Sequence, residues 1–175
     1  MLKIYLGCDL FTSGQKNQAK QIETMLKSLM PQSLDIYNPA DNMDINDKEA
    51  SFASGSQILT ADYNRLKESD GLIALMDTQD IGLAAEMGMA FELGIPIFQL
   101  YTDSRLTGNT VIEKFEQLEK DVFQNDFLYI NKLVTGLSYV DKFGKEYEKP
   151  LIYKTEKDLI MGVMNYYNGD YFKED

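Results

Sequence analysis

The sequence predicts a single-domain α/β protein with a parallel sheet of about five strands flanked by helices. Short apolar runs alternate along the chain with segments whose apolar residues recur at helical spacing, which is the order of a parallel sheet. GLIALMD, residues 71–77, is a continuous apolar run, as expected of a central strand covered by helices on both faces. The length of 175 residues allows one domain with a substantial core and is short for two.

The composition narrows the class of function before any motif is considered. A net charge of −11 argues against a nucleic-acid-binding surface, which needs clusters of Lys and Arg. No apolar run reaches the roughly 18 residues of a membrane span, so we expect no membrane partner. Cys8 is the single cysteine, which suits a reducing cytoplasm. The chain has no histidine, so Ser-His, Cys-His and His-ligated zinc chemistry are excluded.

The first half of the chain predicts two strands and two helices. Residues 2–7 combine apolar and β-forming side chains, and residues 15–30 show a helical apolar period. Residues 35–37 predict a short second strand. Residues 38–56 are polar and without period, and loops of that length are often functional. Residues 57–68 again show the period of a helix.

The second half continues the alternation. Strands are expected over residues 71–77 and 95–103, with a helix over residues 79–94 between them. The remaining expected elements are a helix over 111–123, a short strand over 127–130, a helix beginning at 131, an additional hairpin around 138–154 and a helix over 155–167. We therefore expect one flavodoxin-like or Rossmann-like domain over residues 1–175, with ligands bound at the carboxyl ends of the strands.

Acidic residues gather at that edge of the predicted sheet. Asp9, Asp77 with Asp80, and Asp103 each come just after a predicted strand. Asp80 also stands where a helix begins, and a carboxylate there is stabilised by the helix dipole whether or not it has another role.

Glu86 is the most informative residue of the predicted helix over 79–94. On a helical wheel it falls with Gly82, Met89, Ala90 and Leu93. An ionised carboxylate on such a face must find donors, shift its pKa or serve a function. Gly82 would leave room for a bound molecule beside the backbone. The alternative is an apolar face displaced by one residue, with Glu86 exposed to solvent.

Three further residues have ordinary structural interpretations from sequence alone. Asp62 lies on a predicted helix and reads as a surface charge. Tyr5, inside the first strand, reads as a core aromatic whose phenol needs a partner if it is buried. Cys8 reads as a small buried apolar residue, because no basic neighbour in sequence would activate it.

Several segments, taken in order, resemble the nucleoside 2-deoxyribosyltransferase family. They are KIYLGCDLF, ADYNRLKESDGLIALMD, DIGLAAEMGMAFELGIPI, YTDSR and NKLVTGL. The most specific is Asp-x-Gly-x-x-x-Glu-Met-Gly-x-Ala, from Asp80 to Ala90. Asn-x-x-Val-x-Gly, from Asn131 to Gly136, supports it, and the resemblance spans roughly residues 2–137.

The resemblance implies roles for individual residues. Glu86 would attack the anomeric carbon of a 2'-deoxynucleoside, and Tyr5 would orient its carboxylate. Asp80 and Asp62 would hold the base and move its proton. Asn131 would contact the sugar or the nucleophile, in some members from a neighbouring subunit.

The resemblance also implies the partners of the protein. Its substrates would be 2'-deoxynucleosides and nucleobases, with no metal or organic cofactor, and the protein would be a homo-oligomer. Asp9 would lie on the sugar side of the site, where family members vary. Residues 138–154 look like added length, and the aromatic and acidic tail, NYYNGDYFKED, has no assigned role.

Three other interpretations remain open at this point. A hydrolase on the same scaffold would cleave deoxynucleosides or their 5'-monophosphates, although only Thr12, Ser13 and Lys16 are available near the first loop for a phosphate. A receiver-like domain would hold Mg²⁺ between Asp9 and Asp77, but it would leave Glu86 unexplained. A nucleoside sensor without catalysis is the third.

Overall fold

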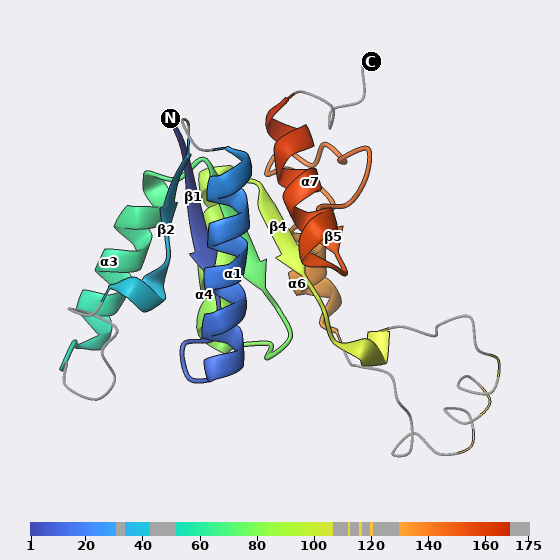
Figure 1. Ribbon diagram of the computed structural model, residues 1–175, viewed down its shortest axis with the longest axis horizontal. Helices are drawn as coiled ribbons and strands as arrows, with labels where there is room; N and C mark the ends of the chain where they lie inside the picture. Colours follow the sequence, from blue (N-terminus) through green and yellow to red (C-terminus); the bar gives the residue numbers. More distant parts are fainter. Residues whose placement is uncertain are drawn as a thin grey trace.

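The computed structural model describes residues 1–30, 34–42, 52–106 and 130–168, together with residues 112, 116 and 120. Its centre is a five-stranded, entirely parallel sheet in the order β2-β1-β3-β4-β5 (Figure 1). The strands are β1 (Leu2–Gly7), β2 (Leu34–Tyr37), β3 (Gly71–Leu75), β4 (Ile97–Leu100) and β5 (Ile152–Tyr153). The predicted α/β class and the predicted number of strands are confirmed.

The fifth strand differs from the one predicted from sequence. Ile152 and Tyr153 pair in parallel with Gln99 and Leu100 of β4, within the segment expected to form a hairpin. A two-residue strand carries too little pattern to be recognised without its neighbour. The expected strand over 127–130 lies outside the described residues except for Ile130, which is irregular. Most of the helix expected over 111–123 also lies outside them.

A tight turn does precede β5. Val140 and Glu146 form an isolated antiparallel bridge, and Gly144 between them has a φ of 81°. That backbone conformation is readily adopted by glycine and costs other residues energy.

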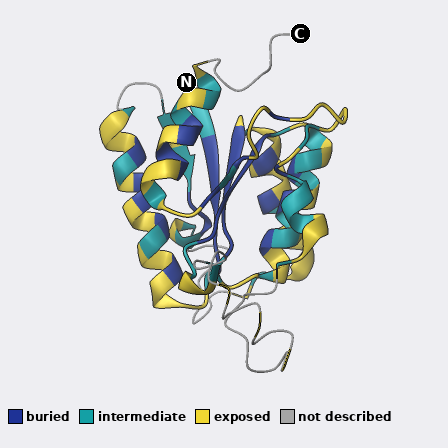
Figure 2. Cartoon of the chain, turned by 90° about the vertical axis from the view of Figure 1, so that its right-hand side faces the viewer, coloured by how far each residue is buried: buried dark blue, intermediate teal, exposed yellow. Residues whose placement is uncertain are grey.

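Helices cover both faces of the sheet (Figures 1 and 2). On one face lie α1 (Ser13–Leu29) and α7 (Glu156–Tyr167). The opposite face is covered by α3 (Gly55–Lys67), α4 (Ile81–Leu93) and α6 (Lys132–Gly136). Each layer closes its own apolar core, one around Ile4, Leu6 and Phe98 and the other around Leu72 and Met87. Within the described part of the chain, no helix is both long and apolar enough to cross a membrane.

The helices begin where capping residues stand in the sequence. Thr12, Ser54, Asp80 and Thr155 each accept a hydrogen bond from a backbone N–H of the first turn of their helix. α4 ends at Gly94, whose φ of 78° gives the left-handed cap that commonly closes a helix. The helix starts could therefore be predicted to within about two residues.

The strand order creates one position suited to a ligand. β1 pairs with β2 on one side and with β3 on the other, so the chain reverses its direction of winding between β1 and β3. Ligands of such sheets bind outside the carboxyl ends of the strands at this reversal. The relevant strand ends here are Gly7 and Leu75.

Candidate active site

Tyr5 and Glu86 meet at this reversal in strand order. The Tyr5 hydroxyl donates a hydrogen bond of 2.9 Å to Oε1 of Glu86, across 81 positions of sequence. Tyr5 is wholly buried in β1 on the face covered by α4. Glu86 lies in the second turn of α4. The partner that a buried phenol requires is therefore the carboxylate that the sequence marks as unusual.

Gly7 allows α4 to approach β1 this closely. A Cβ atom at Gly7 would lie 2.5 Å from Cδ1 of Leu83 and 3.3 Å from Oε2 of Glu86. A side chain there would therefore push α4 away from the strand or displace the carboxylate. The glycine at the end of β1 is a packing requirement of the site.

The surroundings of Glu86 favour its protonated form. The pKa of Glu86 is raised to about 8, chiefly because the carboxyl group is shielded from water and also because of the negative charges of Asp62 and Asp80, while the hydrogen bond from Tyr5 opposes the shift. Burial and the neighbouring Glu86 hold the pKa of Tyr5 far above its ordinary value. The phenol thus remains a hydrogen-bond donor at any physiological pH.

Asp62 and Asp80 complete an acidic cluster with Tyr5 and Glu86. Asp62 is only 9% exposed, so its interpretation as a surface charge is wrong. Leu66, one turn later and fully buried, shows that this side of α3 faces the sheet. Asp80 caps α4 by accepting a 2.8 Å hydrogen bond from the N–H of Leu83. The helical period alone did not indicate the burial of Asp62, because α3 has a mixed polar surface, and only the family resemblance implied a place for it in the site.

Gly82 and Asp9 border the acidic cluster in different ways. A Cβ atom at Gly82 would lie 3.0 Å from Oδ1 of Asp80, so the glycine keeps that carboxylate unobstructed. Asp9 is buried, and its Oδ1 accepts a 2.6 Å hydrogen bond from the N–H of Phe11. Cys8 beside it is buried as expected, and burial raises the pKa of its thiol to about 12. The thiol is therefore not a nucleophile at neutral pH.

Sequence reasoning missed the aromatic wall beside Tyr5. The ring of Tyr37, at the end of β2, lies 5.2 Å from the ring of Tyr5. Arg65 of α3 stands 5.0 Å above the same ring, and the Asn42 amide donates to the Tyr37 hydroxyl at 3.0 Å. The available signal in the sequence was Tyr37 at the end of the second predicted strand, which lies next to the strand of Tyr5 in the parallel sheet.

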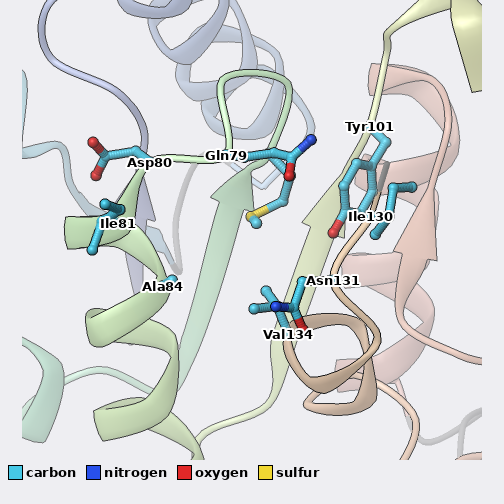
Figure 3. Close-up of a pocket in the computed structure, with 9 residues that line it drawn as sticks. Gln79, Asp80, Ile81, Ala84, Tyr101, Ile130, Asn131 and Val134 are labelled. Atoms are coloured by element: carbon cyan, nitrogen blue, oxygen red, sulfur yellow. The ribbon is translucent and has the colours of Figure 1, made fainter. Parts of the chain in front are cut away.

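Asn131 lies in a cavity of about 240 Å³ between the N-terminus of α4 and α6, called here the side pocket (Figure 3). Its lining residues are Met76, Gln79, Asp80, Ile81, Ala84, Tyr101, Ile130, Asn131 and Val134. Figure 3 shows the side chains of Gln79 and Asn131 extending into the space, while the carboxylate of Asp80 turns away from Tyr101. Asp80 thus stands between the acidic cluster and the side pocket. Glu86 and Asn131 line different parts of the site.

Asp77 and Asp103 have structural partners. The carboxylate of Asp77 accepts hydrogen bonds from the hydroxyl and N–H of Thr102 and from the N–H of Asp103, which joins the ends of β3 and β4. Asp103 forms an ion pair with Arg105. No group of three or more Cys, Asp or Glu in the described residues is arranged to hold a metal ion.

Fold and site together define a doubly wound α/β protein with a partly buried carboxylate at the reversal of strand order. The family model described as nucleoside 2-deoxyribosyltransferase matches residues 4–128. The chain belongs to that family, as its sequence motifs indicated.

Solved structures share the fold of this chain. A conserved protein from Enterococcus faecalis V583 is 32% identical, with a TM-score of 0.79 over 95% of this chain and 99% of that one. A 2-deoxyribosyltransferase from Bacillus psychrosaccharolyticus is 19% identical, with a TM-score of 0.58 over 90% of each chain. One from Leishmania mexicana is 16% identical, with a TM-score of 0.52 over 95% and 99%. The last two show a shared fold, and no curated protein sequence matches the chain.

Proposed function

We propose that this protein transfers 2-deoxyribose between nucleobases through a covalent deoxyribosyl-Glu86 intermediate. The observation that carries the proposal is the partly buried Glu86 carboxylate, to which the Tyr5 hydroxyl donates a hydrogen bond of 2.9 Å, in a chain that belongs to the nucleoside 2-deoxyribosyltransferase family. A carboxylate is the nucleophile that such a reaction needs in a chain without histidine.

The proposed reaction has two steps. In the first, a Glu86 oxygen forms a bond to C1' of the deoxynucleoside while the N-glycosidic bond breaks. Its electron pair goes to the base nitrogen, which is protonated by an acid of the site. In the second, a different base attacks C1', the bond to Glu86 breaks, and the proton of the incoming base returns to the acid. Two displacements retain the configuration at C1'.

The electrostatics of Glu86 suit this chemistry. Only the ionised carboxylate is nucleophilic. With a pKa of about 8, the ionised form is more basic than an ordinary carboxylate and therefore a stronger nucleophile. Positive charge develops on the sugar in the transition state, and a buried anion next to it stabilises that charge strongly. The Tyr5 hydroxyl donates its hydrogen bond to Oε1, so Oε2 is the oxygen that would attack C1'.

The other residues would serve binding and proton transfer. Asp80 and Asp62 flank Glu86 and would hold the base and exchange its proton. Asn131 would bind substrate, in the same chain or across a subunit interface. Gly82 leaves room beside Asp80, and Asp9 lies near the sugar. We further propose a homo-oligomer that works in the cytoplasm without a cofactor.

Chromatography of purified protein with 2'-deoxyinosine and adenine, alongside a tube without adenine, tests the proposal. We expect 2'-deoxyadenosine in the first tube. Glu86→Ala should remove activity while the protein stays folded. Glu92→Ala is the matched control, because Glu92 lies on the exposed side of the same helix.

Two results would count against the proposal. Hypoxanthine and free deoxyribose formed equally in both tubes would indicate a hydrolase. An active Glu86→Ala protein would remove Glu86 from the role of nucleophile.

A further inference from the structure

Gln99 is a buried amide in the middle of β4 with no role in the chemistry above. Its side chain is 0% exposed. Nε2 donates to the carbonyl oxygen of Val134 at 2.9 Å and to Oγ of Ser138 at 2.7 Å, and Oε1 accepts from the hydroxyl of Tyr101 at 2.8 Å. Both Nε2 hydrogens and the amide oxygen are therefore engaged. A buried amide so fully paired holds its partners in a defined geometry.

Two of these bonds attach α6 to the sheet. α6 has five residues, and a helix that short has little stability of its own. None of its residues is fully buried, and of its five residues Val134 packs against the apolar core. Ser138, just after α6, extends the attachment by donating to the carbonyl oxygen of Ile97 at 2.6 Å. The position of α6, and of Asn131 at its start, thus depends on polar contacts with β4.

The third bond fixes a second wall of the side pocket. Tyr101 follows β4, and its ring lines the side pocket on the side away from α4 (Figure 3). Its hydroxyl is held by Gln99, so the ring cannot swing into the cavity. Gln99 itself does not line the side pocket, yet Tyr101, Val134 and, through α6, Asn131 are placed by it.

We propose that Gln99 is a positioning residue that sets the shape of the side pocket, and that the pocket binds the deoxynucleoside substrate beyond Asp80. The inference rests on the proposed function for the identity of the substrate. Apolar walls with two amides, Gln79 and Asn131, suit a planar ligand with polar edges such as a nucleobase. Loss of Gln99 would therefore weaken substrate binding without touching Glu86.

The test compares Gln99→Leu with Tyr101→Phe and Ser138→Ala, which each remove one partner hydroxyl. We expect each single change at Tyr101 or Ser138 to raise KM for 2'-deoxyinosine roughly 3- to 10-fold with little change in kcat. Gln99→Leu should raise KM at least as much. Added to Gln99→Leu, Tyr101→Phe should have no further effect, because the bond it removes is already absent. Ser138→Ala should add a further increase in KM, because the Ser138 hydroxyl also donates to the carbonyl oxygen of Ile97.

Tyr167→Phe is the matched control. The Tyr167 hydroxyl donates to the backbone oxygen of Asp70 at 2.8 Å, on the face of the sheet covered by α7. Its loss should lower thermal stability by a similar amount and leave KM unchanged. Equal KM changes in this control, or an unchanged KM in Gln99→Leu, would overturn the inference.

A second readout separates this inference from the proposed function. The dissociation constant of 2'-deoxyinosine, measured by calorimetry in the Glu86→Gln background, should rise in the same variants by the same factors. If the wild type transfers no sugar but this series holds, the proposed function fails and the role of Gln99 stands. If the wild type transfers the sugar but the dissociation constants do not differ among the variants, the proposed function stands and the role of Gln99 fails.

Discussion

The Glu86 carboxylate is partly buried next to two other acids, and within the described part of the chain its hydrogen-bond donor is the neutral hydroxyl of Tyr5. The ionised form of a carboxyl group is unfavourable when the group is shielded from water among like charges. The pKa of Glu86 is therefore raised, and the group holds a proton at neutral pH. A cation in the place of Tyr5 would keep the carboxylate ionised and less nucleophilic. The phenol orients the group and neutralises none of its charge.

This arrangement predicts a pH dependence of activity. Because the ionised carboxylate reacts and its pKa is about 8, kcat/KM should rise about tenfold per pH unit below that value. The Tyr5 hydrogen bond lowers the pKa of Glu86, so Tyr5→Phe should move the rising limb to higher pH. Steady-state rates between about pH 5 and 9 would show it.

Tyr63→Phe serves as the control for that profile, since Tyr63 is an exposed residue of α3. Its profile should coincide with that of the wild type. A rising limb that stays in place in Tyr5→Phe, or moves to lower pH, would contradict the assigned role of the phenol.

At the scale of elements, α4 carries Glu86 and follows directly on Asp80, two residues of the candidate site, and Asp80 also caps the helix. Its N-cap Asp80 belongs to the acidic cluster, its second turn carries Glu86, and Gly7 of β1 lets it pack closely. Asp80 caps the helix and is proposed to take part in the reaction, and suitable substitutions should separate these two roles.

Asp80→Asn and Asp80→Ala test that separation. Asparagine caps helices as well as aspartate does, whereas alanine costs about 1 kcal/mol. We expect both variants to lose activity and only Asp80→Ala to lose stability, as measured by urea denaturation. Thr155→Ala, a cap of α7 far from the acidic cluster, should lose similar stability and keep activity. Full activity in Asp80→Asn would remove the carboxyl group from the reaction.

At the scale of the whole molecule, exposed apolar side chains stand at the mouth of the site. Ile81, which lines the side pocket from α4, is 86% exposed, and Leu133 of α6, next in sequence to the lining residue Val134, is 80% exposed. Single exposed apolar residues are ordinary, but two on the helices that border a candidate binding cavity suit contact with a second copy of the chain. This placement supports the proposed homo-oligomer.

Light scattering during gel filtration tests the assembly. The wild type should have a mass that is a multiple of one chain, and Ile81→Asp should shift it towards a single chain, because a charge placed in an apolar interface lacks a partner. Met161→Asp, on the exposed side of α7, should not change the mass. A wild type that runs as a single chain would contradict the proposal.

The sequence by itself determined the fold class, most of the helix boundaries and the unusual place of the Glu86 carboxylate on its helix. These features rest on local information: an apolar run in β3, a helical period, capping residues at Thr12 and Asp80, and a carboxylate on a face of small residues. The family motifs lie in the same continuous segments. Tyr5 could be named as the partner of Glu86 only through the resemblance, because the two lie 81 positions apart.

The tertiary structure decided what depends on distant segments meeting. Asp62 became a buried member of the acidic cluster because α3 packs against the sheet, and β5 formed because Ile152 and Tyr153 found the free edge of β4. Gln99 acquired its role from Val134 and Ser138, which lie 35 and 39 positions away. Periodicity within a segment records which face is apolar, but contacts between segments are set by the packing of the whole chain.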